Sequence, residues 1–462
     1  MPIVPEAQGI DNAIQERFCA FMKRFRVASL LRSAGATKEK GVAVGLLFTF
    51  LLGLVFTRKN LYETMTAKRE KPSFSKNTVY RFLASCVVNW EIFIRRLSAA
   101  VIPEVDKLTT EKRKTVLILD DTPYWRDRSK KVEMLSRCYD HSLHKYYNGF
   151  TMLNLGWSDG QTYMPVDFRL LASGNDKNLL EGSHVKEDKR TLATKRRTEA
   201  RKEKPVLALQ MLKDARGTPA QTEHVLFDSW FASPSFILSV KDLEYNVVAR
   251  IKNHENYRYL YDGKKMSISQ LFKANKKRRG KSRYLLSVTV EVRHEDFQNT
   301  VPATIVFVRN RADRKKWIAL ISTDITLNED EIVALYGKRW DIEPFHKVLK
   351  STLKLTDEFQ IRSFDAITAH SAIVLTRYIV LSIENRENKD DRSIGGIFSL
   401  FCQELEDISF QYAFALLMTL LQQCCSEYFC ISNDQINRFV EHFIACLPRC
   451  IKDRLPDYVW ES

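Results

Sequence analysis

Apolar side chains recur at helical spacing through the first hundred residues of the chain. Phe18, Met22 and Phe25 belong to one such series, and residues 92–102 form another. Steps of three and four residues return side chains to one face of a helix, which is normally the buried face. The pattern therefore predicts a helical region over residues 1–110.

The segment that begins at Ser75 has the pattern of a capped helix. A Ser or Asn side chain is followed by Thr-Val-Tyr-Arg-Phe, as at the start of a recognition helix in a helix-turn-helix unit. On this interpretation residues 1–110 bind DNA, and Lys76, Asn77 and Arg81 contact it. A capped surface helix without a partner fits the same pattern.

Residues 111–251 change to short apolar runs with turn signals between them. Strands are predicted at residues 116–121, 150–157, 162–168, 224–228 and 246–251, with a helix at 205–215. Continuous apolar runs are typical of strands that are buried on both faces. Strands that alternate with helices in this way predict an α/β class, with a mixed sheet flanked by helices.

Residues 252–325 interrupt that order. Alternation of polar and apolar positions, as at 284–293, predicts a β-rich insertion. Within the insertion, directly before residues 284–293, residues 273–283 carry seven basic residues and no acidic one. A solvated loop fits this run, and so does contact with a DNA backbone through Lys277 and Arg278.

Helical periodicity returns at residues 326–390 and 391–462. Beyond Gly395 the chain has four Arg or Lys residues against nine Asp or Glu. Because DNA would repel this acidic region, we interpret it as a candidate for protein contacts and for dimerisation.

The charge of the whole chain is positive, unlike that of its C-terminal region. The 462 residues include 72 Lys and Arg against 56 Asp and Glu, a formal net charge of +16. Such an excess favours a polyanionic partner, with double-stranded DNA first, although a basic enzyme of another kind fits as well. The longest apolar stretch, residues 42–56, is shorter than the roughly 20 residues of a membrane span. With no visible signal peptide, we expect no membrane and a cytoplasmic protein that associates with cellular DNA.

Three acids stand in positions that suit a metal site. Asp121 and Asp228 each end a predicted buried strand, where open α/β sheets place ligands, and Glu343 lies on a later helix. Three convergent carboxylates repel one another unless they are protonated or bind cations. Oxygen ligands favour Mg²⁺, for which Mn²⁺ would substitute, and a pair of such ions suits phosphodiester chemistry.

The helix around Glu343 carries further polar groups at helical spacing. Tyr336, Arg339, Glu343 and Lys350 follow at steps of three, four and seven, which would place them on one stripe. Pro344 disfavours helical geometry in the residue before it, so the helix is expected to kink there or to restart with Pro344 in its first turn.

These motifs resemble those of insertion-sequence transposases with an RNase H-like core and an Asp-Asp-Glu triad, in particular the subgroup with a Tyr-Arg-Glu-Lys signature. Asp121-Thr122 resembles the first acid motif, and Asp228 followed by Ser-Trp-Phe resembles the second. The resemblance covers roughly residues 110–385, and the β-rich insertion is similar to the one that the subgroup carries.

The resemblance implies cut-and-paste transposition by a metal-dependent enzyme that forms a homodimer on DNA. Asp121, Asp228 and Glu343 would be the catalytic metal ligands. Tyr336, Arg339 and Lys350 would contact phosphates, and Lys347 on the same helix is a further candidate DNA contact.

Several alternatives remain open at this point. Asp120 and Asp121 point to opposite faces of a strand, and the Asp-Thr pairing favours Asp121. A role for Asp228 as no more than a cap for the helix that begins near Ser233 fits the sequence as well, and so does a role for Glu343 in a surface ion-pair ladder. A nuclease of the same fold without strand transfer, and a non-catalytic DNA-binding protein, are the alternative functions.

Overall fold

The computed structural model describes most of the chain up to Glu387 and parts of the region beyond it. The described ranges are residues 13–37, 41–58, 60–66, 72–109, 113–140, 143–184, 188, 190–278, 282–310, 316–387 and parts of 394–451. Most of the predicted C-terminal region, residues 388–393 and residues 279–281 of the basic run lie outside them.

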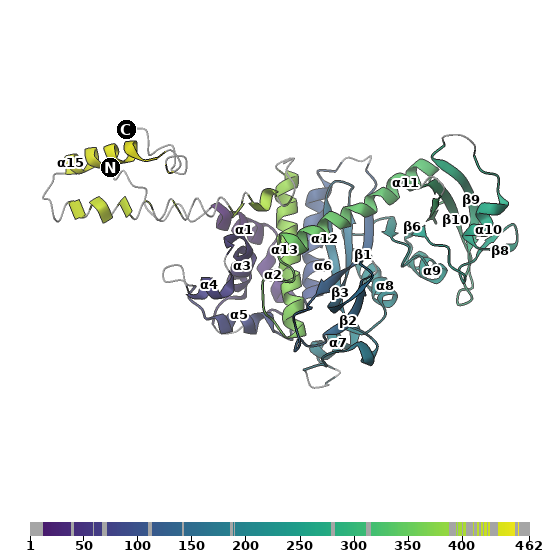
Figure 1. Cartoon of the computed structure of the whole chain (residues 1–462), viewed down its shortest axis with the longest axis horizontal. Helices are drawn as coiled ribbons and strands as arrows, with labels where there is room; N and C mark the ends of the chain where they lie inside the picture. The colour runs from purple at the N-terminus through teal and green to yellow at the C-terminus, as the bar shows by residue number, and fades with distance from the viewer. Residues whose placement is uncertain are drawn as a thin grey trace.

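Helices occupy the first quarter of the chain and alternate with strands after it (Figure 1). The helices are α1 (Ala13–Arg24), α2 (Val27–Ser33), α3 (Val44–Leu54), η1 (Val55–Thr57), α4 (Leu61–Thr66), α5 (Lys76–Leu83), α6 (Trp90–Asp106), η2 (Asp176–Asn178), α7 (Leu192–Ala200), α8 (Lys204–Ala215), α9 (Pro234–Asp242), α10 (Ile268–Ala274), α11 (Glu329–Gly337), η3 (Lys338–Asp341), α12 (Ile342–Ser351), α13 (Phe364–Glu387) and α15 (Asn433–Cys446). The strands are β1 (Val116–Trp125), β2 (Ser136–Asp140), β3 (Lys145–Ser158), β4 (Tyr163–Leu171), β5 (His224–Phe227), β6 (Asn246–Ile251), β7 (Tyr259–Tyr261), β8 (Lys264–Met266), β9 (Tyr284–Val292), β10 (Val301–Arg309) and β11 (Trp317–Ser322).

The described strands form one mixed sheet in the order β2-β3-β1-β5-β6-β11-β10-β9-β7-β8, with β4 also beside β3. Strands β1, β5 and β6 are parallel, whereas β3 and β4 run antiparallel. This arrangement is RNase H-like, so the predicted fold class is confirmed. The parallel strands are apolar because both of their faces are covered, and the side chains of residues 116–119 and 225–227 are fully buried.

The region between β6 and α11 extends this sheet. Strand β11 pairs antiparallel with β6, so residues 252–325 continue the sheet of the core at its edge. Along β9 buried and more exposed residues alternate, as the sequence pattern predicted. Trp317 packs against Phe272 and Phe307, with both ring centres 5.0 Å away, and this places Trp317 in the packing of the extension.

The N-terminal helices pack against α13. Helix α3 is apolar nearly all round, and its buried Phe48 contacts Trp90 and Phe93 of α6. The fully buried Arg377 of α13 donates from Nε to the Leu52 carbonyl at the end of α3, 3.1 Å away, and from Nη1 and Nη2 to Glu358. A buried charge is stable here because its hydrogen bonds are satisfied on both sides.

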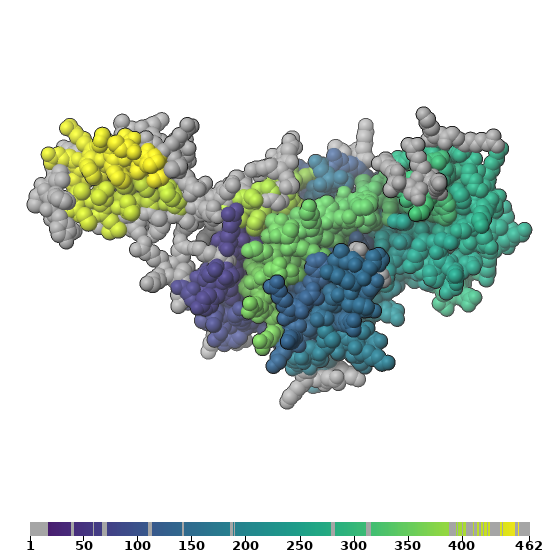
Figure 2. All heavy atoms as spheres, viewed as in Figure 1, coloured from purple at the N-terminus to yellow at the C-terminus, as the bar shows by residue number. Residues whose placement is uncertain are grey.

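Helix α13 joins this N-terminal bundle to the sheet. In Figure 2 the green segment that includes α11–α13 lies across the centre of the visible face, between the purple N-terminal helices and the teal strands. Among the described helices α13 alone is long and apolar enough to cross a membrane, a feature that our sequence analysis missed. Its apolar window is wholly buried in the protein, as is typical of a core helix. Helix α15 packs in a separate small cluster with Met418.

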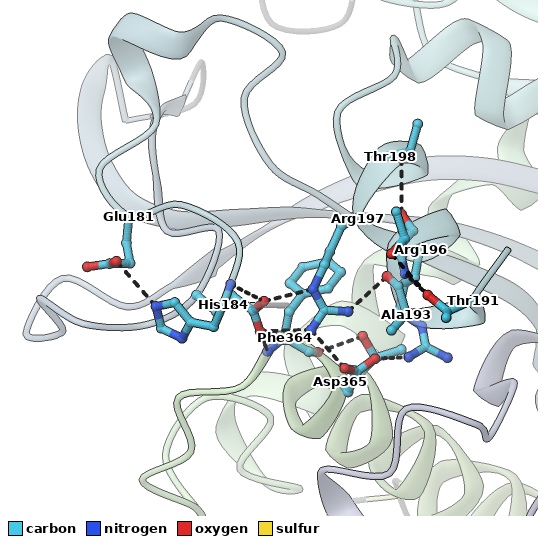
Figure 3. A network of polar contacts seen from close by, with 12 residues as sticks. Glu181, His184, Thr191, Ala193, Arg196, Arg197, Thr198, Phe364 and Asp365 are labelled. Carbon is cyan, nitrogen blue, oxygen red and sulfur yellow. Dashed lines mark hydrogen bonds and ion pairs between the residues drawn. The ribbon is translucent and has the colours of Figure 1, made fainter. Parts of the chain in front are cut away.

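A buried ion network fixes α7 against the start of α13 (Figure 3). Arg197 donates to both oxygens of Glu133, at 2.7 and 2.8 Å, and to Asp365 Oδ2 at 2.7 Å. Arg196 also pairs with Asp365 and donates to the Val88 carbonyl at 2.6 Å. The basic run at 195–197 therefore contributes two arginines to the interior.

Candidate active site

Asp120 and Asp121 lie on opposite faces of β1. The Oδ2 atom of Asp120 lies 3.4 Å from Nη1 of Arg339, on the face that η3 and α12 cover. The Oδ2 atom of Asp121 accepts a hydrogen bond from Nζ of Lys204, on α8, at 3.0 Å. Successive side chains of a strand point to opposite faces, so only one of the two acids can share a site with α12. The structure brings Asp120, which was the less favoured choice from sequence, into that position.

Asp228 follows the strand next to β1. Leu119 and Phe227 are partners in the parallel β1–β5 pair, so Asp120, inside β1, lies level with Asp228, which directly follows β5; β1 itself continues to Trp125, beyond the end predicted at residue 121. The Oδ1 atom of Asp228 accepts the Trp230 backbone N–H at 2.9 Å, which shapes the loop. Ser233, not Asp228, caps α9, which removes the interpretation of Asp228 as that helix's cap.

The helix that carries Glu343 is broken before the acid. Helix α11 ends at Gly337, the 3-10 turn η3 follows, and α12 begins at Ile342 with Pro344 in its first turn. This restart is one of the outcomes expected from Pro344, because proline lacks a donor that the first turn does not need. Arg339 still reaches Glu343: its Nη2 donates to Oε1 at 2.9 Å.

Electrostatics places these groups in one neighbourhood. Burial raises the pKa of the Asp120 carboxyl to about 7; the charges of Asp121 and Asp228 act in the same direction, and Arg339 opposes them. Burial also raises the pKa of Tyr336, with Arg339 acting against this and Asp228 with it. The charge of the Asp120 carboxylate is therefore opposed by the neighbouring carboxylates, and a bound cation would relieve this repulsion.

Two contacts hold α12 on the sheet. Phe345 packs on Tyr163, with ring centres 4.6 Å apart, and Tyr163 lies so close to Gly156 that a Cβ there would be 2.1 Å from its ring. The Nδ2 atom of Asn154 lies 3.1 Å from Nε2 of the buried His346. The orientation of Glu343 therefore depends on packing beneath α12 as well as on the helix itself.

Asn154 and His346 were not among the residues predicted for the site. Asn154 is the direct partner of Asp120 in the β1–β3 ladder, so the two side chains share a face of the sheet. Burial lowers the pKa of His346 to about 3, and the charges of Lys350 and Arg339 act in the same direction, so the imidazole is neutral. The signal in the sequence was the amide of Asn154 inside the apolar run 150–157. A polar side chain in a fully buried strand requires a hydrogen-bond partner.

Comparison with known protein families identifies the family of this chain. Residues 46–297 match the family described as DDE superfamily endonuclease, which is more than half of the chain. The protein belongs to this family. No curated protein matches the chain. The matched segment contains β1 and β5 with Asp120, Asp121 and Asp228, whereas Glu343 lies outside it.

Membership of the DDE endonucleases implies nuclease chemistry on DNA with divalent metal ions. Within the described part of the chain, no three His, Cys, Asp or Glu side chains are grouped closely enough to hold a metal as they stand. The donor chemistry of Asp120, Asp228 and Glu343 nevertheless suits a hard cation, because all their ligand atoms are carboxylate oxygens. A positive charge already lies between two of them, on Arg339.

Other residues predicted to contact DNA in this endonuclease are distributed around the site. Lys347 is exposed on α12, and the Lys350 ammonium lies 5.2 Å from the ring centre of Trp125, at the end of β1. Burial lowers the pKa of Lys350, and Asp140 opposes this. Tyr336 and Arg339 are largely buried. The signature residues therefore do not all point outward on one stripe.

Three further predicted DNA contacts lie on other elements of the endonuclease. Arg81 is exposed on α5, whose first turn is capped by Ser75. Arg278 pairs with both carboxylate oxygens of Glu329 at 2.6 and 2.7 Å, and the Lys277 ammonium lies 4.8 Å from the ring centre of Phe272. These contacts are within the protein and do not test DNA binding, so the role of the three residues in DNA binding stays a prediction.

Proposed function

We propose that this DDE endonuclease is a transposase of the Tyr-Arg-Glu-Lys subgroup. It would cleave DNA at the ends of an insertion sequence by metal-assisted hydrolysis and join the freed 3′-hydroxyls to target DNA. Pairing two ends requires two active sites, so the protein would act as a homodimer on DNA. The helical region that contains α4 and α5 would contribute to end binding.

The supporting observation is the contact of Arg339 with both Asp120 and Glu343. It joins an acid of β1 to an acid of α12, and Asp228 lies at the end of the neighbouring parallel strand. We therefore propose Asp120, Asp228 and Glu343 as the triad, in place of the set with Asp121.

Each residue of the site has a role that its chemistry supports. The three carboxylates would hold Mg²⁺, which activates water or a 3′-hydroxyl and stabilises the leaving oxygen when it is bound. Arg339 can fork onto a phosphate, and Lys350 and Lys347 supply point charges beside it. Tyr336 would donate one hydrogen bond, and burial keeps its phenol protonated.

The test measures cleavage of a supercoiled plasmid that carries the gene with its native flanking DNA. The wild-type protein is compared with variants that each carry one substitution. Asp120→Asn, Asp228→Asn and Glu343→Gln should each abolish cleavage in Mg²⁺ while DNA binding in a gel-shift assay persists. Asp121→Asn is the matched control and should still cleave. Cleavage by Asp228→Asn would refute the triad, and loss of cleavage only in Asp121→Asn would restore Asp121 as the first ligand.

A second assay separates a transposase from a nuclease that does not join strands. Pre-cleaved ends with free 3′-hydroxyls are incubated with a target plasmid and Mg²⁺, and joined products are detected on a gel. Joining supports transposition. Cleavage of the first plasmid without joining of pre-cleaved ends would assign the protein to nucleases of the same fold.

A further inference from the structure

The guanidinium of Arg339 lies between two acids of the proposed triad. Nη2 is 2.9 Å from Glu343 Oε1, and Nη1 is 3.4 Å from Asp120 Oδ2. The Arg339 side chain is only 9% exposed, and its guanidinium carbon lies 4.9 Å from the ring centre of Trp340. Arg339 thus provides the positive charge that these two carboxylates need in the absence of any other cation.

A divalent ion and this guanidinium compete for the same carboxylate oxygens. A carboxylate oxygen that accepts a hydrogen bond from Arg339 uses a lone pair that would otherwise be available to bind a metal ion. Positive charges held a few ångströms apart near a protein surface repel with an energy that changes affinity by orders of magnitude. A metal can therefore occupy the triad fully only if Arg339 moves.

The surroundings of Arg339 permit such a movement. Its Nε is buried and has no hydrogen-bond partner within the described part of the chain, and its contact with Asp120 is long. Glu343 is 46% exposed on its side chain and Trp340 is 59% exposed, so the outer side of the guanidinium borders solvent. Arg339 also belongs to η3, the short turn between two helices, and not to the interior of either.

We propose that Arg339 is a displaceable counter-ion that couples metal loading to DNA binding. This inference rests on the proposed function, since it takes Asp120 and Glu343 as metal ligands. Without DNA, Arg339 pairs with these acids and weakens their affinity for a divalent ion. A DNA phosphate offers the guanidinium a bidentate partner of greater charge, and the acids become free for the metal. By linkage, the metal strengthens DNA binding by the same factor.

The experiment measures Mn²⁺ binding to the full chain, with free Mn²⁺ followed by electron paramagnetic resonance. In the absence of DNA, Arg339→Met should bind Mn²⁺ about tenfold more tightly than the wild type, and Arg339→Lys should stay close to wild type. Arg216→Met is the matched control, because Arg216 pairs with Glu244 at the end of α8 and its loss removes the same charge. Equal Mn²⁺ affinity in Arg339→Met, Arg216→Met and wild type would overturn the inference.

A second arm needs no change at Arg339. A generic duplex of 30 base pairs should tighten Mn²⁺ binding to the wild type about tenfold, after subtraction of the Mn²⁺ held by the duplex alone. No tightening would also overturn the inference, whether or not the Arg339 variants fold.

Failure of the counter-ion is distinguishable from failure of the proposed function. Asp228→Asn and Glu343→Gln should each remove the tight Mn²⁺ site of Arg339→Met. If these acids are needed for Mn²⁺ binding but Arg339→Met has wild-type affinity, only the counter-ion role fails. If Mn²⁺ binding is indifferent to both acids, the metal site of the proposed function fails as well.

Discussion

Lys204 lies on the opposite face of the sheet from Arg339, with its Nζ 3.0 Å from Asp121 Oδ2. The same ammonium lies 4.4 Å from the ring centre of Trp230, whose backbone N–H bonds to Asp228. Lys204 therefore ties the strand of the first acid to the loop of the second. Asp121, which sequence favoured as a metal ligand, has a partner that suits a positioning role.

Loss of this tie should slow catalysis without removing it. We expect Lys204→Met to lower the cleavage rate about tenfold, because small displacements of a catalytic group cost one to two orders of magnitude. Lys204→Arg should recover part of the rate, since it keeps the charge. The measurement is single-turnover cleavage at saturating DNA, with Lys213→Met on the exposed side of α8 as the control. A wild-type rate in Lys204→Met would contradict the positioning role.

The Asn154–His346 contact is expected to be essential for the stability of α12. Asn154→Ala leaves the buried imidazole without its partner and should lower the free energy of unfolding by about 1–3 kcal/mol in a urea titration. Replacing both residues by leucine should cost less than the two single changes together, because no unsatisfied polar group remains. Additive costs would show that the two side chains do not interact.

The stability of the metal-free protein should depend on pH through Asp120. Its pKa in the fold is about 7, above the ordinary 3.8, so the contribution of this carboxyl is complete below about 3.8 and is lost as pH rises through 7. Asn at this position cannot ionise. Asp120→Asn should therefore melt at the same temperature as the wild type below about pH 3.8 and at a higher temperature at pH 8, with most of the difference arising between these pH values, in calorimetry with chelator present. A wild-type protein that is the more stable of the two at pH 8 would refute this assignment.

The buried network of Figure 3 should be sensitive to the loss of one charge. Arg197→Met removes the arginine that pairs with Glu133 and one of the two arginines that pair with Asp365, and should reduce the free energy of unfolding by about 3–5 kcal/mol. Arg190→Met, which removes an exposed partner of Asp188, should leave the urea midpoint unchanged. Similar midpoints for the two variants would show that burial does not strengthen the pairing.

The sequence by itself determined the elements that carry the two aspartates. Apolar runs that end at Asp120–Asp121 and at Asp228 predicted buried strands, and these are the adjacent parallel strands β1 and β5. Periodicity also determined the helical start of the chain, and Pro344 indicated the restart of the helix at Glu343. These features depend on local sequence, because backbone preference and burial pattern act over a few residues.

Tertiary structure decided which side chains meet. Asp120 and Arg339 are separated by 219 residues, and only the packing of η3 and α12 on one face of β1 selects Asp120 over Asp121. The same holds for Asn154 with His346, and for Arg196 and Arg197 with Asp365. The face that a side chain shares with a partner depends on which layer covers that face, and local sequence does not contain this information.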